Sequence, residues 1–201
     1  MSNVVPLTII KGATFEKVLR WGSPTPTYKD ITGATAAAPC VITATGHGLV
    51  DGWPVFISRI VGLEHPDTGK GINSGTPRKA RVLTSDTFAL DAINAAGYSA
   101  YTSGGVVTYH APISLSGFTA RMQIRSSRGA TGDPLLELTT ENSRIVLDDT
   151  AKTITLALTD AVTEALTFSR GVYSLEMESS GGVVTPLVAE SPVVVVSEVT
   201  R

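Results

Sequence analysis

The fold is decided by a stretch whose residues alternate in character, Thr153-Ile154-Thr155-Leu156-Ala157-Leu158. In an extended chain Ile154, Leu156 and Leu158 lie on one side, and the threonines lie on the other. This period of two is typical of a β-strand with one face in a core and the other toward solvent. Residues 173–178 alternate in the same way. The pattern therefore predicts a protein built from half-buried strands.

Strand signals continue on both sides of this stretch. Short runs rich in Val, Ile, Thr and aromatic residues, bounded by turn residues, predict further strands. The expected strands are Val4–Ile10, Phe15–Trp21, Val41–Ala44, Val55–Ser58, Arg81–Leu83, Phe88–Leu90, Val106–Tyr109, Phe118–Arg125 and Val193–Val196. Strands do not alternate with long helical patterns, so the sequence predicts an all-β fold and argues against an α/β enzyme.

Turn residues predict which strands form hairpins. The turn Lys11-Gly12-Ala13 predicts a first hairpin between Val4–Ile10 and Phe15–Trp21. A second hairpin is expected around Ser85-Asp86. Asp148-Asp149 is expected to be a turn rather than a catalytic carboxylate pair, because Asp favours turns.

Three other segments have distinct expectations. Residues 22–27 contain two prolines and are expected to interrupt strand structure. The valines at 193–196 predict a strand that is buried on both faces. The only helix expected is short, over Ala161–Leu166, with Thr159 or Asp160 as its cap.

The composition leaves two explanations open. Charged residues make up 17% of the 201 residues, below the roughly 25% usual for soluble domains, and hydrophobic residues make up 42%. Either the chain is an ordinary β protein with threonine-rich exposed faces, or partner subunits cover much of its surface, where charge is costly to desolvate. The net charge of −2 and the lack of a long basic run argue against nucleic acid as a partner.

Compartment signals are few. Cys40 is the only cysteine, so no internal disulfide can form, and the apolar Val41-Ile42 beside it predicts a buried thiol. The segment Met1–Pro6 lacks a basic region followed by an apolar one, and no apolar run approaches the roughly 20 residues that span a bilayer. We therefore expect no membrane partner, and folding in a cytoplasm.

An internal echo predicts the domain organisation. Ile31-Thr32-Gly33-Ala34-Thr35 and Leu115-Ser116-Gly117-Phe118-Thr119 both read aliphatic, hydroxyl, Gly, any residue, Thr. We expect residues 31–110 to be inserted into a host domain formed by residues 1–30 and 111–201, because 1–30 hold only two expected strands and cannot close a core alone. The alternative is two consecutive domains, with the echo arising from common turn residues.

The host part resembles the N-terminal immunoglobulin-like domain of phage baseplate upper proteins and related tail components. The segments that carry this resemblance, in order, are Ile10–Phe15, Leu115–Arg125, Ile154–Leu156, Thr159–Leu166, Gly171–Glu176 and Val193–Thr200. They cover nearly all of the host part. The resemblance implies an immunoglobulin-like β-sandwich.

The insert is similar to a small β-barrel module that recurs in phage tail proteins and is itself similar to the first catalytic-cysteine half-domain of ubiquitin-activating enzymes. The residues that carry this similarity are Val41–Leu49, Gly52, Val55, Ile57, Val61-Gly62, Ile72-Asn73, Thr87–Leu90 and Gly104-Gly105. The loop Glu64–Gly71 is longer than the usual pattern. The similarity implies a structural module only, with no ubiquitin chemistry and no catalytic role for Cys40.

Together the two resemblances imply a bacteriophage virion protein of the tail, baseplate or neck that acts by subunit assembly. Its expected partners are other virion proteins and copies of itself, in a homo-oligomer or a multi-copy ring. Its expected location is the virion, after synthesis in the host cytoplasm. Two alternatives remain: a glycan- or receptor-binding module, and a capsid decoration protein.

No set of residues predicts catalysis. His47, His65 and His110 lack the spacing of a helical zinc pair, and there is no second cysteine to complete a metal site. His47 stands between two glycines and is expected to bond to local backbone in a turn. Gly62–Lys70 departs from the phosphate-loop spacing, and no Gly-x-Ser-x-Gly motif occurs. We therefore expect no enzyme activity, no metal and no cofactor.

Two groups of residues are candidates for contact with a partner. The basic cluster Arg78, Lys79 and Arg81 either attracts an acidic partner surface or forms a solvated shoulder of a hairpin. The aromatic residues Trp53, Tyr98 and Tyr101 either stack on a glycan or pack in the core and rim of the module. The first alternative in each case predicts a partner or glycan contact site.

Overall fold

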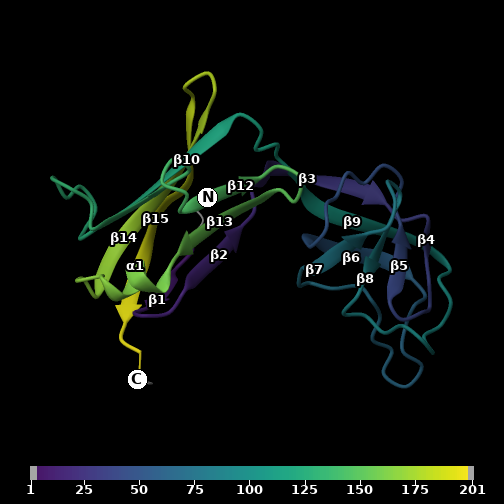
Figure 1. The fold of residues 1–201 in the computed structure, drawn as a ribbon. Helices are drawn as coiled ribbons and strands as arrows, with labels where there is room; N and C mark the ends of the chain where they lie inside the picture. The colour runs from purple at the N-terminus through teal and green to yellow at the C-terminus, as the bar shows by residue number, and fades with distance from the viewer. Residues whose placement is uncertain (1–3, 199–201) are drawn as a thin grey trace. The chain divides into compact units, whose positions relative to one another are not determined.

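The computed structural model describes residues 4–198 and is all-β, with 51% strand and 3% helix. The chain divides into two compact units, which are drawn in Figure 1. Unit 1 combines the N-terminal residues up to Trp21 with the residues from Ser114 onward, and unit 2 is Gly22–Ile113. Residues 22–30 and 111–113, assigned above to the host part, fall in unit 2. Residues 22–30 do so because they pair with a strand of that unit, and this strand itself extends to Pro112.

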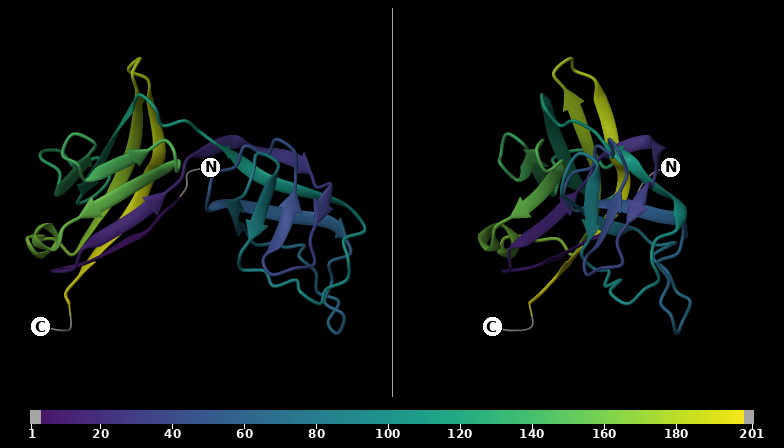
Figure 2. Two further views of the ribbon diagram at one scale, coloured as in Figure 1. Left: turned by 45° about the vertical axis from the view of Figure 1, so that its right-hand side comes forward. Right: turned by 90° about the vertical axis from the view of Figure 1, so that its right-hand side faces the viewer.

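A five-stranded sheet forms one side of unit 1. Its strands, in spatial order, are β1 (Leu7–Ile10), β15 (Val184–Val196), β14 (Arg170–Ser179), β10 (Phe118–Arg125) and β11 (Leu136–Thr139). Strand β1 runs parallel to β15, and all other neighbours are antiparallel. The long β14–β15 hairpin is visible in both views of Figure 2. The short N-terminal strand β1 thus forms one edge of this sheet, beside the C-terminal strand β15.

A three-stranded antiparallel sheet forms the other side of unit 1, in the order β12 (Ile145–Asp148), β13 (Thr153–Leu158) and β2 (Phe15–Leu19). The helix α1 (Asp160–Glu164) follows β13 directly. The hydroxyl of Thr159 caps this helix by accepting from Val162 N at 3.4 Å. The presence of the helix, its cap at Thr159 and the extents of β10 and β13 confirm the sequence predictions, but the helix ends at Glu164 rather than at Leu166.

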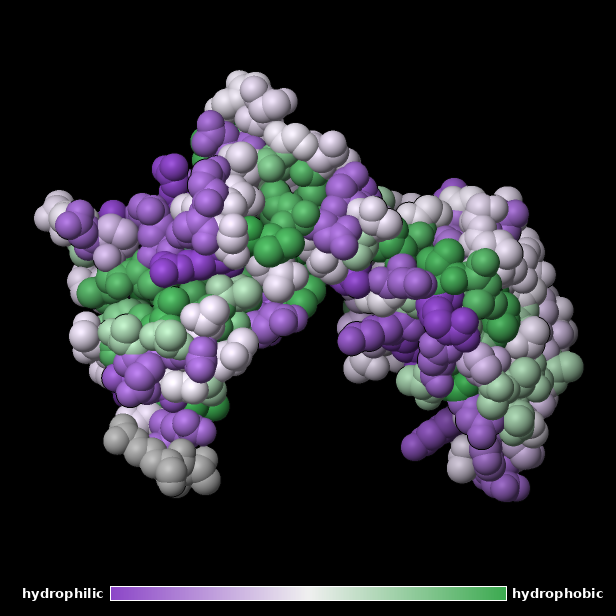
Figure 3. Space-filling view, viewed as in Figure 1, coloured by the Kyte–Doolittle hydropathy of each residue, from purple (hydrophilic) through white to green (hydrophobic). Residues whose placement is uncertain are grey.

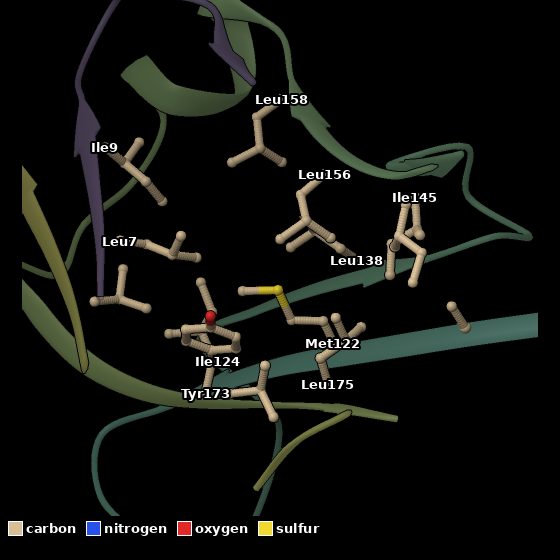
Figure 4. Packing of buried hydrophobic residues seen from close by; sticks show 14 of the residues in the cluster. Leu7, Ile9, Met122, Ile124, Leu138, Ile145, Leu156, Leu158, Tyr173 and Leu175 are labelled. Carbon is tan, nitrogen blue, oxygen red and sulfur yellow. The ribbon is translucent and has the colours of Figure 1, made fainter. Parts of the chain in front are cut away.

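One core joins the two sheets of unit 1. The inward residues of both sheets form a single buried cluster. Figure 4 shows Leu7 and Ile9 of β1 in this cluster together with Leu156 and Leu158 of β13. Tyr173 lies in this cluster, and its hydroxyl donates to the Val5 carbonyl oxygen at 2.8 Å. This arrangement follows from the period-two pattern, since each strand contributes every second residue. The curled sheets are compatible with a β-sandwich.

Unit 2 contains a seven-stranded sheet and its own core. The strands in spatial order are β3 (Gly22–Asp30), β9 (Ser103–Pro112), β6 (Trp53–Val61), β7 (Arg78–Val82), β8 (Thr87–Leu90), β5 (Cys40–Thr43) and β4 (Gly33–Ala34). Trp53, Ile57 and Phe88 are among its fully buried side chains. Cys40 is a buried free thiol, and desolvation raises its pKa, as its apolar surroundings predict.

Three sequence expectations are wrong. Strands β1 and β2 do not form a hairpin, because β1 pairs with β15 and β2 pairs with β13 in the other sheet. Residues 22–27 belong to strand β3, where Pro24 and Pro26 are tolerated because β3 is an edge strand. The valines 193–196 are buried on one face only, since Val194 and Val196 are each 38% exposed.

The predicted hairpin around Ser85-Asp86 is confirmed by the pairing of β7 with β8. The predicted turn at Asp148-Asp149 joins β12 to β13, and Asp148 Oδ1 accepts from the amides of Thr150 and Ala151. The resemblance carried the last strand to Thr200, of which residues 199–200 lie outside the described part of the chain.

Candidate functional site

The aromatic candidates serve the structure of unit 2. Trp53 on β6 is 2% exposed, and its indole Nε1 donates to the His110 carbonyl oxygen at 2.8 Å. A buried indole offers no face to a ligand, so the expected contact role of Trp53 is corrected to a core role. The hydroxyl of Tyr101 lies 3.0 Å and 2.9 Å from the carbonyl oxygens of Ile31 and Gly104.

Tyr98 is partly buried against the core of unit 2. Its ring contacts the imidazole of His65 edge to face, with centroids 5.6 Å apart. Its backbone N–H donates to the Ala95 carbonyl oxygen at 3.0 Å, which closes a turn. Each of the three aromatic side chains therefore has a packing or hydrogen-bonding role inside the unit.

The basic candidates border a groove. Arg78, Lys79 and Arg81 all lie on β7 and line a depression of about 600 Å³. We call it the β7 groove; its lining is Asp51, Gly52, Thr76–Arg81 and Leu90–Ile93. The sequence identified the basic wall, but it gave no signal for the opposite wall, because residues 90–93 reach the groove only through the pairing of β8 with β7.

The groove arises where two paired strands diverge. Strand β7 pairs with β8 only at Arg81↔Ala89 and Val82↔Phe88. The preceding residues of β7 pair with β6 on the other side, with Lys79 opposite Pro54. Strand β8 ends at Leu90, so beyond this point the β8 side of β7 has no neighbouring strand among the described residues.

The charges at the groove are only partly paired. Arg81 Nε lies 2.8 Å from Asp91 Oδ2, and this hydrogen bond raises the pKa of the Arg81 guanidinium and lowers the pKa of the Asp91 carboxyl. Asp51 Oδ1 accepts from Val82 N at 2.6 Å. Arg78 and Lys79 form no ion pair within the described residues, and the buried Nε of Arg78 has no hydrogen-bond acceptor.

A second groove lies in unit 1 beside two of its edge strands, β1 and β2. It has a volume of about 290 Å³ and is lined by Pro6, Leu7, Thr8, Ile10 and Ala13–Lys17. We call it the edge groove, because β1 ends the five-stranded sheet and β2 ends the three-stranded sheet. Apolar residues emerge on the outer faces of these strands, with Ile10 45% and Val18 47% exposed. Figure 3 shows apolar patches that reach the surface between polar residues.

The remaining polar groups have structural roles. His47 Nδ1 accepts from Leu49 N at 3.0 Å, and Nε2 lies 3.1 Å from the Thr84 carbonyl oxygen, so the predicted turn role of His47 is confirmed. Asp149 Oδ1 accepts from Lys152 Nζ and Leu115 N, each at 2.6 Å, and the bond from Lys152 is the main cause that lowers the pKa of Asp149 to about 2.

Within residues 4–198, no group of three or more metal-ligating side chains comes together. No helix in this part of the chain is both long and apolar enough to cross a membrane. Comparison of the sequence with protein-family models and with curated proteins finds no match. The two grooves and the sheet edges are the features of the described chain that bear on its function.

Proposed function

We propose that this chain is a structural protein of a bacteriophage virion, placed in the tail, baseplate or neck, which acts by subunit assembly and not as an enzyme. In this proposal unit 1 is an immunoglobulin-like sandwich and unit 2 is an inserted small β-barrel module. The order of the segments that resemble phage tail components supports it. The partners are copies of this chain and other virion proteins.

The observation that carries the proposal is the composition of the edge strand β1. A strand at the edge of a sheet presents unpaired N–H and C=O groups, and monomeric proteins protect such edges with charged residues, proline or bulges. Strand β1 reads Leu7-Thr8-Ile9-Ile10 and has none of these. Its register with β15 is regular over all four residues. An edge of this kind favours pairing with a strand from another chain.

The outer face beside this edge is also suited to an interface. Thr8 is the register partner of Val194, and Ile10 is the register partner of Val196. The side chains of Ile10, Val194 and Val196 are all partly exposed on that face. Aliphatic side chains next to an unprotected edge are buried when a neighbouring strand extends the sheet. The edge groove provides room for side chains of the added strand.

The test measures mass in solution and then position in the particle. Size-exclusion chromatography with light scattering should give a multiple of the 21.0 kDa chain mass for the wild-type protein. The double substitution Thr8→Lys, Ile10→Lys places two charges at the edge without touching the core and should yield the monomer. The matched control Val184→Lys, at an exposed residue near the tip of the β14–β15 hairpin, should assemble like the wild type.

A wild-type monomer at every concentration tested would contradict assembly through β1. Immunogold electron microscopy of phage particles should label the tail, baseplate or neck. Label over the capsid shell would instead identify a decoration protein.

A further inference from the structure

We infer that the β7 groove of unit 2 binds an extended acidic polypeptide segment of a partner protein, which pairs with β7 as an additional strand. This site belongs to unit 2 and does not depend on the assembly proposed for β1. Three properties of the groove carry the inference: an unpaired length of strand, an apolar floor and an excess of positive charge over the lining as a whole.

The unpaired length is the first half of β7. In an antiparallel ladder, alternate residues direct their peptide groups to opposite sides. Ala80 uses its carbonyl oxygen toward β6, where it accepts from Gly52 N at 2.8 Å, and Arg81 pairs with β8. Lys79 therefore directs its N–H and C=O to the same side as Arg81, into the groove where β8 has ended. A strand added here restores the ladder.

The floor of the groove is apolar. Ala80 and Leu90 are buried, and Pro77, Ala92 and Ile93 complete the lining. Every second side chain of an added strand faces this floor, and the others face solvent. An aliphatic residue at the inward positions removes apolar surface from water. The ligand is therefore a chain with a period of two, like the strands of the protein itself.

The rim selects negative charge. Lys79 and Arg81 are exposed on β7, and they stand opposite the outward residues of an added strand. Three cations line the groove against the two carboxylates of Asp51 and Asp91. Arg78 lies on the same face of β7 as Ala80, toward the floor of the groove. Its buried Nε–H has no acceptor, and a bound ligand would supply a carbonyl or carboxylate oxygen. Outward glutamate or aspartate side chains complement this arrangement.

The test uses capped octapeptides of alternating valine and glutamate, labelled with fluorescein, and the full chain. The valine–glutamate peptide should bind saturably in fluorescence anisotropy, and a valine–lysine peptide should not. Lys79→Glu should weaken binding about tenfold or more, because it replaces an attractive cross-strand pair with a repulsive one. The control Arg128→Glu reverses an exposed charge of unit 1 and should leave binding unchanged. The assembly variant Thr8→Lys, Ile10→Lys should also bind as the wild type does.

Hydrogen exchange distinguishes an added strand from a simple charge contact. The bound peptide should slow exchange of the Lys79 amide, because that N–H enters a hydrogen bond. Polygalacturonate, an acidic polysaccharide, carries carboxylates but no peptide ladder and should not slow it. Absence of saturable peptide binding, equal binding by Lys79→Glu, or equal protection by polygalacturonate would overturn the inference.

Discussion

The two units have separate cores, and a single substitution in one core should unfold that unit first. Leu156 on β13 is fully buried and pairs across the sheet with Ile145. Figure 4 shows its side chain directed into the cluster of unit 1. Leu156→Ala removes most of this side chain from a site where strands of both sheets limit relaxation. We expect a loss of about 3 kcal/mol in the free energy of unfolding of unit 1.

The two tryptophans allow the assay to report each unit alone. Trp21 lies in unit 1 and packs edge to face on Phe118, and Trp53 lies in the core of unit 2. In a Trp53→Phe background, Trp21 fluorescence follows urea unfolding of unit 1; in a Trp21→Phe background, Trp53 follows unit 2. With a urea slope of about 1.5 kcal/mol per M, Leu156→Ala should lower the midpoint of unit 1 by about 2 M.

The midpoint reported by Trp53 should stay within error of its value before Leu156→Ala. Ile57→Ala, a buried residue of unit 2, is the matched control and should lower only that second midpoint. Equal shifts of both midpoints in either variant would refute the separation of the cores. A loss under about 1 kcal/mol for Leu156→Ala would refute the buried position of this side chain between the two sheets.

Three further predictions concern single contacts. Tyr173→Phe leaves the Val5 carbonyl without its donor and should cost about 1 kcal/mol in urea unfolding at pH 7. Burial raises the pKa of Tyr173 to about 12. The stability that its hydroxyl contributes is therefore complete below the ordinary pKa of 10 and is lost as pH rises toward 12. If the difference in unfolding free energy between wild type and Tyr173→Phe does not shrink over this range, the mechanism is contradicted. Asp149→Asn should lower the melting temperature at pH 7 and much less at pH 2, because the folded pKa of about 2 lies below the ordinary 3.8, and stability present above 3.8 is lost as pH falls through 2. An equal effect at both values of pH would show that the charge of Asp149 does not matter. Gly62→Ala should destabilise unit 2 by about 2 kcal/mol or more in the Trp53 assay, since Gly62 has φ +87° and an added Cβ would meet a backbone oxygen at 2.2 Å; Gly48→Ala, also at positive φ but with open space around it, should cost less.

The local pattern was sufficient for two strands that have one buried face. Thr153–Leu158 and Phe118–Arg125 were predicted with the ends that the structure gives them, because alternation by itself determines which side chains turn inward. The helix after Thr159 was predicted from its cap for the same reason, since capping is a matter of neighbouring residues. Cys40 was correctly placed in a core by the apolar residues beside it.

Pairing between distant segments could not be predicted in this way. Strand β1 has a turn after it that suits a hairpin, yet it joins β15 at the other end of the chain, because burying Leu7 and Ile9 between two sheets outweighs the local turn. Strand β3 was missed because its prolines are signals of a loop, and only its place at a sheet edge makes them compatible with a strand.

The same distinction between local pattern and long-range pairing applies to the candidate site. Arg78, Lys79 and Arg81 were recognised as a basic cluster from their closely spaced charges, whereas the choice between glycan stacking and core packing for Trp53 stayed open because its burial depends on strands that are remote in sequence. The sequence by itself determined the all-β character, the inward side of most strands and the basic wall of β7. Only the tertiary structure decided where β7 and β8 diverge and which sheet edge stays unprotected, because both depend on long-range register, and a register is set by the whole core rather than by any one strand.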